Sequence, residues 1–149
     1  MPALAQNKKA YHDYEVLEEY EAGLVLTGSE VKSLRQGNAS LKGSFVTAHG
    51  EALMLTNAHI GHYKPAAANN HEPLRSRLLL LKASEIKKIL GKLTQQGFSC
   101  VPLEIYAKKH FIKLKLAVVR GKKLYDKKRE KKDRDIRRDA ERELRGLKR

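Results

Sequence analysis

Cysteine, tryptophan and long apolar runs are scarce or missing in this chain of 149 residues. Its one cysteine, Cys100, cannot form a disulfide within the chain, which favours a reducing compartment and a small buried thiol. No apolar run approaches the roughly 20 residues that a membrane-spanning helix needs. The first residues also lack the apolar stretch of a secretory signal. The sequence therefore predicts a cytoplasmic protein with one folded domain and an appendage.

Signatures of catalysis are missing as well. No phosphate-binding GxxxxGK[ST] loop, GxGxxG turn, GxSxG elbow or HExxH zinc motif occurs. His59, His62 and His71 could hold zinc only if the fold brought them together, and no cysteine pair accompanies them. A ribonuclease could use His12 or His110 as a general base, but no pattern links either residue to a partner. We expect no enzyme activity, no cofactor and no metal.

Positive charge is what the chain has in excess. It carries 31 Lys and Arg against 17 Asp and Glu, a formal net charge of +14. A polyanion is the natural partner for such a surface, because each phosphate contact releases condensed counterions. An anionic membrane surface is the rival partner. Residues 122–149 alone hold 14 of the basic residues and 7 of the acidic ones. This imbalance predicts two parts, a body over 1–121 and a basic C-terminal tail over 122–149.

The tail has too few apolar residues to fold by itself, since ordering costs about 1–2 kcal/mol per residue. Ile136, Ala140, Leu144 and Leu147 nevertheless recur at helical spacing among residues that form helices well. We expect a tail that is disordered alone and becomes helical once phosphates neutralise its Lys and Arg. Composition leaves open the alternative of a solvated, solubilising tail.

Short alternating segments dominate the body. Thr27 and Glu30 have the spacing of a capping box, which predicts a short helix that ends at Gly37. A second helical face precedes Gly97, and residues 61–76 have the composition of a loop. Strands are expected at 13–26, 45–48, 52–55, 78–81, 101–108 and 112–118, the last two joined as a hairpin through Lys109 and His110. The pattern predicts a mainly β fold with α, an OB-like β-barrel with flanking helices, of a kind that often binds oligonucleotides.

Recognition of single bases is not the obvious mode of binding. The aromatic pattern of RRM domains and a GXXG loop are both missing. Tyr63, Tyr106 and Tyr125 could stack on bases, although Tyr63 and Tyr106 fit the surface or core of a barrel better. These features favour recognition of the backbone and shape of a folded RNA.

Four segments together resemble one family. They are NKKAYHDY at 7–14, YEAGLVLTGSEVKSLR at 20–35, NHEPLRSRLLLL at 70–81 and GKKLYDKK at 121–128. They are similar to segments of the SsrA-binding protein (SmpB) family, and the similarity extends from Asn7 to about Lys132. Departures include Lys82 where Asn or His is usual and Lys128 where Arg is usual, which gives up bidentate phosphate geometry.

The resemblance implies a partner of transfer-messenger RNA (tmRNA) in trans-translation, without catalytic activity. Such a protein binds the tRNA-like domain of tmRNA and delivers it to the empty A site of a stalled ribosome. Its tail then lies in the vacant mRNA channel, and the protein acts as a monomer. A ribosomal protein and a ribonuclease remain as alternatives from the residues alone.

The resemblance also implies two groups of binding residues. The RNA-binding group is Asn7, Lys8, Lys9, Glu21, Glu30, Lys32, Arg35, Arg75, Arg77, Leu80 and Lys113. The ribosome-contacting group is Gly121, Lys122, Lys123, Tyr125, Asp126, Lys127, Lys128 and Lys132. Glu21 and Glu30 are unusual in a basic site. A carboxylate there can orient a neighbouring Lys or Arg, or accept a hydrogen bond from a ribose hydroxyl.

Overall fold

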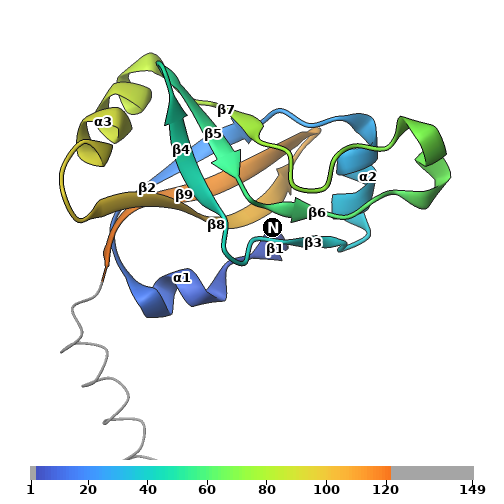
Figure 1. Ribbon diagram of the computed structural model, residues 1–149, viewed down its shortest axis with the longest axis horizontal. Helices are drawn as coiled ribbons and strands as arrows, with labels where there is room; N and C mark the ends of the chain where they lie inside the picture. The colour runs from blue at the N-terminus through green and yellow to red at the C-terminus, as the bar shows by residue number, and fades with distance from the viewer. Residues whose placement is uncertain (1–2, 122–149) are drawn as a thin grey trace, which may run out of the picture.

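One antiparallel sheet of seven strands forms the centre of the structure, a computed structural model that describes residues 3–121 (Figure 1). The strand order is β1-β8-β9-β2-β7-β5-β4. The strands are β1 (Ala3–Gln6), β2 (Tyr14–Leu24), β4 (Phe45–His49), β5 (Ala52–Thr56), β7 (Arg77–Leu80), β8 (Phe98–Lys108) and β9 (Phe111–Gly121). Two short strands, β3 (Ala39–Ser40) and β6 (His59–Ile60), pair with each other beside it.

The sheet is not closed into a barrel. Strands β1 and β4 stand at the two ends of the order, and no ladder among residues 3–121 joins them. The prediction of a mainly β fold with helices is confirmed, whereas the OB-like barrel is not. The predicted β8–β9 hairpin is present, and the predicted strands β4 and β5 also pair with each other.

Three strands of 11 residues, β2, β8 and β9, carry most of the sheet. Tyr14 pairs with Gly121 at one end of the β2–β9 ladder, and Gly23 pairs with Lys113 at the other. Nine steps along a strand separate these two pairs by roughly 30 Å. The long ladder therefore gives the molecule two distinct ends.

Helices α2 (Gly28–Arg35) and α3 (Ala83–Leu93) lie at opposite ends of the molecule, and α1 (Lys8–Asp13) lies below the sheet in Figure 1. A 3₁₀ helix, η1 (Lys64–Asn69), interrupts the predicted loop. The capping box is confirmed, because the Thr27 side chain accepts from the Glu30 N–H while the Glu30 side chain accepts from the Thr27 N–H. The sequence patterns did not predict α1 or β1. No helix of the described part of the chain is long and apolar enough to cross a membrane.

The two faces of the sheet are buried to different extents. One face packs on the main core, in which Leu34, Leu53, Leu55, Leu114 and Leu116 have no exposed surface. The other face has a small cluster under α1, made of Ala10, Val101, Leu103, Ala117 and Val119. Helix α1 thus covers only one end of this second face, and the other end stays open to a partner.

Candidate nucleic-acid interface

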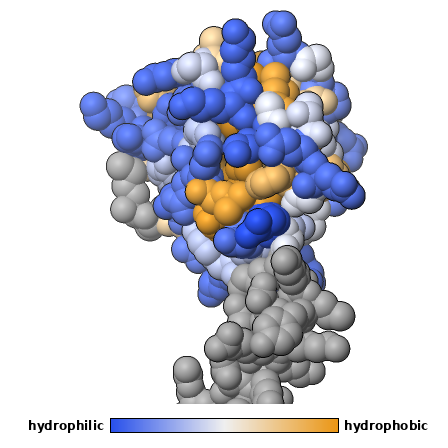
Figure 2. All heavy atoms as spheres, turned by 90° about the vertical axis from the view of Figure 1, so that its left-hand side faces the viewer, coloured by the Kyte–Doolittle hydropathy of each residue, from blue (hydrophilic) through white to orange (hydrophobic). Residues whose placement is uncertain are grey.

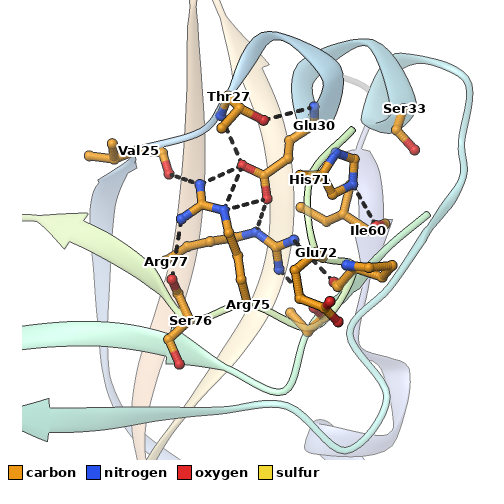
Figure 3. Close-up of polar contacts among 12 residues, drawn as sticks. Val25, Thr27, Glu30, Ser33, Ile60, His71, Glu72, Arg75, Ser76 and Arg77 are labelled. Atoms are coloured by element: carbon orange, nitrogen blue, oxygen red, sulfur yellow. Dashed lines mark hydrogen bonds and ion pairs between the residues drawn. The ribbon is translucent and has the colours of Figure 1, made fainter. Parts of the chain in front are cut away.

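A buried group of charges lies at the start of α2 (Figure 3). Glu30 is the third residue of the helix, and its carboxylate accepts hydrogen bonds from the Thr27 N–H, the Arg75 guanidinium and Nε of Arg77. Arg77 also donates through Nη1 to the Ala58 carbonyl at 2.8 Å and through Nη2 to the Pro73 carbonyl at 3.0 Å. The group joins α2, β7 and the chain before β6.

The group holds one negative and two positive charges. Burial alone raises the pKa of Glu30, but hydrogen bonds from Arg75, Thr27 and Arg77 outweigh it and leave the pKa below the ordinary value. Burial lowers the pKa of Arg77, and the Glu30 carboxylate opposes that shift. The surplus positive charge reaches the surface only through Arg75, whose side chain is 32% exposed.

Glu30 and Arg77 were expected among the residues that contact RNA. Both side chains are 0% exposed, and every polar group of theirs bonds within the protein. A side chain with no exposed surface cannot touch a ligand in this structure. The prediction that Glu30 and Arg77 contact RNA directly is therefore wrong for this structure. Their side chains instead position Arg75, which forms an ion pair with Glu30 and keeps part of its own side chain exposed.

The loop before β7 is fixed to α2 by a buried histidine. His71 is 7% exposed, and its Nε2 donates to the Ile60 carbonyl at 2.8 Å. Its Nδ1 forms a second hydrogen bond, with the Ser29 hydroxyl at 2.8 Å. The sequence places His71 in the predicted loop and gives no sign of this role, because the partner Ser29 is 42 positions away. These two hydrogen bonds of His71 hold the loop in place, so Arg75 projects from a defined position.

The uncovered end of the second sheet face forms what we call the open face: Glu21, Leu80, Tyr106, Lys108, Phe111, Lys113 and Lys115. Direct pairing of Gly23 with both Leu80 and Lys113, and of Tyr106 with Lys113, puts these side chains on one side of the sheet. Leu80 is 57% exposed and Phe111 66% exposed. Lysines thus alternate with exposed apolar groups on one surface.

Gly23 is essential to the shape of the open face. A Cβ at this position would lie 3.3 Å from the Cβ of Leu80, which is tighter than an ordinary contact. Its missing side chain lets Leu80 lie close to β2, with Lys113 on the other side of the glycine.

The Glu21 carboxylate is held by two neighbours on the open face. It accepts a hydrogen bond from the Tyr106 hydroxyl and lies 3.4 Å from Nζ of Lys108. The Tyr106 hydrogen bond is the main reason that the pKa of Glu21 falls below its ordinary value. Nζ of Lys113 lies 5.8 Å from the centre of the Phe111 ring. Glu21 therefore orients a tyrosine and a lysine of the open face.

Helix α1 borders this surface but faces two ways. Asn7 is structural, since its backbone N–H donates to the Leu103 carbonyl and its side-chain amide to the Pro102 carbonyl. Lys8 is exposed on the side of Glu104 and so adjoins the open face. Lys9 lines a separate hollow on the other side of the helix. The structure thus brings Lys8, but not Lys9, to the open face.

The outer side of α2 carries the other two predicted cations. Lys32 and Arg35 are both exposed, and Nζ of Lys32 lies 5.4 Å from the centre of the Tyr63 ring. They belong to the same helix whose first turn holds Glu30, so the buried charge group also fixes the direction in which they project.

The histidines do not assemble into a site. Among residues 3–121 no group of three His, Cys, Asp or Glu side chains is placed to hold a metal ion. His12 belongs to α1 at the Tyr14 end of the long ladder, and His110 belongs to the β8–β9 turn at its other end. The two proposed general bases therefore cannot act in one centre.

Of the expected ribosome-contacting residues, only Gly121 falls within the described part of the chain, as the last residue of β9. Lys122, Lys123, Tyr125, Asp126, Lys127, Lys128 and Lys132 lie outside the described residues.

The family model for SmpB protein matches residues 4–146. This chain belongs to the SmpB family. The SsrA-binding protein of Sulfurihydrogenibium sp. (strain YO3AOP1) is 48% identical over 143 residues, which is 96% of this chain and 94% of that protein. That of Geobacillus kaustophilus (strain HTA426) is 48% identical over 142 residues, 95% of this chain and 92% of that protein.

A solved structure described as "tmRNA-SmpB: a journey to the center of the bacterial ribosome" has the same fold. It is 45% identical to this SmpB-family chain with a TM-score of 0.68, covering 89% of this chain and 94% of that one. Four residues of the open face, Tyr106, Lys108, Phe111 and Lys115, were absent from the predicted group of RNA-binding residues. The alternation of polar residues along 104–115 was the signal that could have found them.

Proposed function

We propose that this chain is a tmRNA-binding protein required for the rescue of stalled ribosomes by trans-translation. One observation carries the proposal: the open face combines lysines, an exposed aromatic ring and an exposed leucine on a rigid sheet. Its membership of the SmpB family and its similarity to SsrA-binding proteins over nearly the whole chain support the same function.

The open face suits a folded RNA better than a single strand. Lys108, Lys113 and Lys115 would contact phosphates, while Phe111 and Leu80 would pack on sugar or on an unstacked base. Glu21 would keep Tyr106 and Lys108 in place and accept from a ribose hydroxyl with its remaining lone pairs. The tRNA-like domain of tmRNA presents such a surface of backbone and 2′-hydroxyl groups.

Other predicted residues take supporting places in this proposal. Asn7 anchors α1 so that Lys8 flanks the open face, and Lys9 meets RNA only at its margin. Arg75, Lys32 and Arg35 form a second row of cations around α2. Glu30 and Arg77 act through Arg75 without touching RNA.

We further propose a division of labour between the body, 1–121, and the tail, 122–149. The body would bind the tRNA-like domain and deliver it to the empty A site, and the tail would enter the vacant mRNA channel. Its basic residues and Tyr125 favour contact with ribosomal RNA. No catalytic step falls to this protein, since peptide transfer belongs to the ribosome, and its place of action is the cytoplasm.

Binding of the full chain to the isolated tRNA-like domain of tmRNA tests the proposal, with a duplex of equal length as the competitor. We expect a clear preference for the tRNA-like domain and a strong fall in affinity with salt. Leu80→Ser should weaken binding, whereas Leu74→Ser, at a leucine that is 49% exposed but off the open face, should not. Equal affinity for both RNAs would overturn the proposal.

A further inference from the structure

A hollow of about 500 Å³ opens on the side of the molecule between α1 and α3, away from the open face. Figure 2 shows apolar residues exposed in it, within a hydrophilic surround. Val46, Cys100 and Val101 are buried residues of its lining, and Leu93 and Phe98 are half-buried ones. Its volume lies within the range of about 300–1,000 Å³ typical of binding pockets. Of the residues in the proposed RNA-binding function, only Asn7 and Lys9, which have supporting places there, also line it.

One wall of the hollow is an unpaired strand edge. Strand β1 pairs with β8 only at Glu104, Ile105 and Tyr106. Residues 98–101 of β8 therefore have β9 on one side and no strand partner on the other within the described structure, whereas the Pro102 carbonyl already accepts from the Asn7 side chain. Such an edge can accept an extended peptide through main-chain hydrogen bonds while a pocket takes one of its side chains. The hollow thus suits a short extended segment with an apolar residue.

The end of β9 lies at the border of this hollow. Arg120 pairs with Phe98, and Gly121 pairs with Tyr14; Phe98 and Tyr14 both line the hollow. The free edge of β8 is about two strand spacings from β9, or roughly 10 Å. Three extended residues after Gly121 span about the same distance. The first apolar residue after β9, Leu124, is three positions on.

Charges at the border of the hollow match the same segment. Two lysines and one aspartate, Lys9, Lys42 and Asp13, line it, and no ion pair within the described residues involves either lysine. In an extended segment, residues two apart lie on the same side, so Asp126 would follow Leu124 toward these lysines. A leucine followed two positions later by an aspartate thus matches the apolar lining and the surplus of one positive charge at its border.

We propose that residues 124–126 of this chain dock in the hollow in the free protein. Leu124 packs against Val46, Leu93 and Phe98, and Asp126 lies beside Lys9 and Lys42. The sequence predicts that the whole tail, 122–149, is disordered alone. The docking would restrict that prediction to the residues after 126, which take no part in the contact. It does not depend on the proposed function, since it concerns the protein without RNA.

Methyl and amide NMR spectra of the full chain test the docking. Leu124→Ser should shift the signals of Leu93, Phe98 and Val101, while Leu147→Ser, the same change far along the tail, should leave them unmoved. Asp126→Lys should cause the same shifts, and adding Lys42→Glu to it should restore most of them. Each substitution outside the body spares the folded core, so the spectra stay comparable. Tryptic cleavage after Lys122 and Lys123 should become several-fold faster in Leu124→Ser.

Three results would overturn the proposal. Identical spectra for Leu124→Ser and the unaltered chain would show that this segment does not occupy the hollow. Shifts that disappear on dilution would assign the contact to the tail of a second copy. Equal shifts from Leu124→Ser and Leu147→Ser would show a diffuse effect of the tail in place of a docked segment.

Discussion

The carboxylate of Glu30 accepts a hydrogen bond from Nε of Arg77, and neither side chain has any exposed surface. A helix of eight residues is thereby joined to a strand 47 positions later in the chain. Arg75 shares the same carboxylate from the surface side. Glu30 and Arg77 therefore hold Arg75 in position and do not present their own side chains at the surface.

Glu30→Gln should lower the free energy of unfolding by about 3–5 kcal/mol, because Arg77 would remain buried without an opposite charge. Urea denaturation measures the change. Glu51→Gln serves as the control, since Glu51 is exposed in the β4–β5 turn and should change stability by less than about 0.5 kcal/mol. A Glu30→Gln protein as stable as the unaltered chain would contradict the role of the pair.

Acid should remove the contribution of Glu30. Its pKa in the folded protein is below the ordinary value of 4.5, so the unfolded chain binds the proton more readily. The stabilisation is therefore complete above about pH 4.5 and declines as the pH falls through the lower, folded pKa. Urea midpoints measured across this range should fall more steeply for the unaltered chain than for Glu30→Gln. Parallel profiles would rule out Glu30 as the source.

His71→Ala should release the loop before β7. The substitution leaves the Ile60 carbonyl and the Ser29 hydroxyl without their buried partner, at a cost of about 1–3 kcal/mol for each. Hydrogen exchange should rise at residues around 61–76 before it rises in the long strands. His110→Ala, in the exposed β8–β9 turn, should affect neither quantity.

Lys113→Glu should weaken binding of the tRNA-like RNA and lower the salt slope of log K by about one unit for the lost phosphate contact. Lys87→Glu makes the same charge change on the exposed side of α3. It should reduce affinity only slightly and leave the slope nearly unchanged. Titrations at several salt concentrations separate the two, and equal slopes would place the RNA elsewhere.

Deletion of residues 122–149 should leave most of the affinity for the tRNA-like domain and abolish tagging of stalled peptides. The physical reason is the proposed division between a rigid body that binds folded RNA and a cationic tail that binds the ribosome. Binding titrations and a reconstituted trans-translation assay measure the two effects. Tagging by the truncated protein would refute the role of the tail.

Local sequence patterns determined many of the elements. The Thr27–Glu30 spacing predicted the start of α2, and alternation along 101–118 predicted the β8–β9 hairpin. These features depend on residues a few positions apart, so one stretch of sequence contains the whole signal. Helix α1 was missed, because it has only six residues and buries only Ala10 against the sheet.

Tertiary structure alone decided which charged residues face a partner. Glu30, Arg75 and Arg77 are equally polar in the sequence, yet two are fully buried and one reaches the surface. The open face likewise unites β2, β7, β8 and β9, from separate parts of the chain. The exposure of a side chain and its neighbours across the sheet depend on how distant segments pack. A pattern of residues along the sequence does not contain that information.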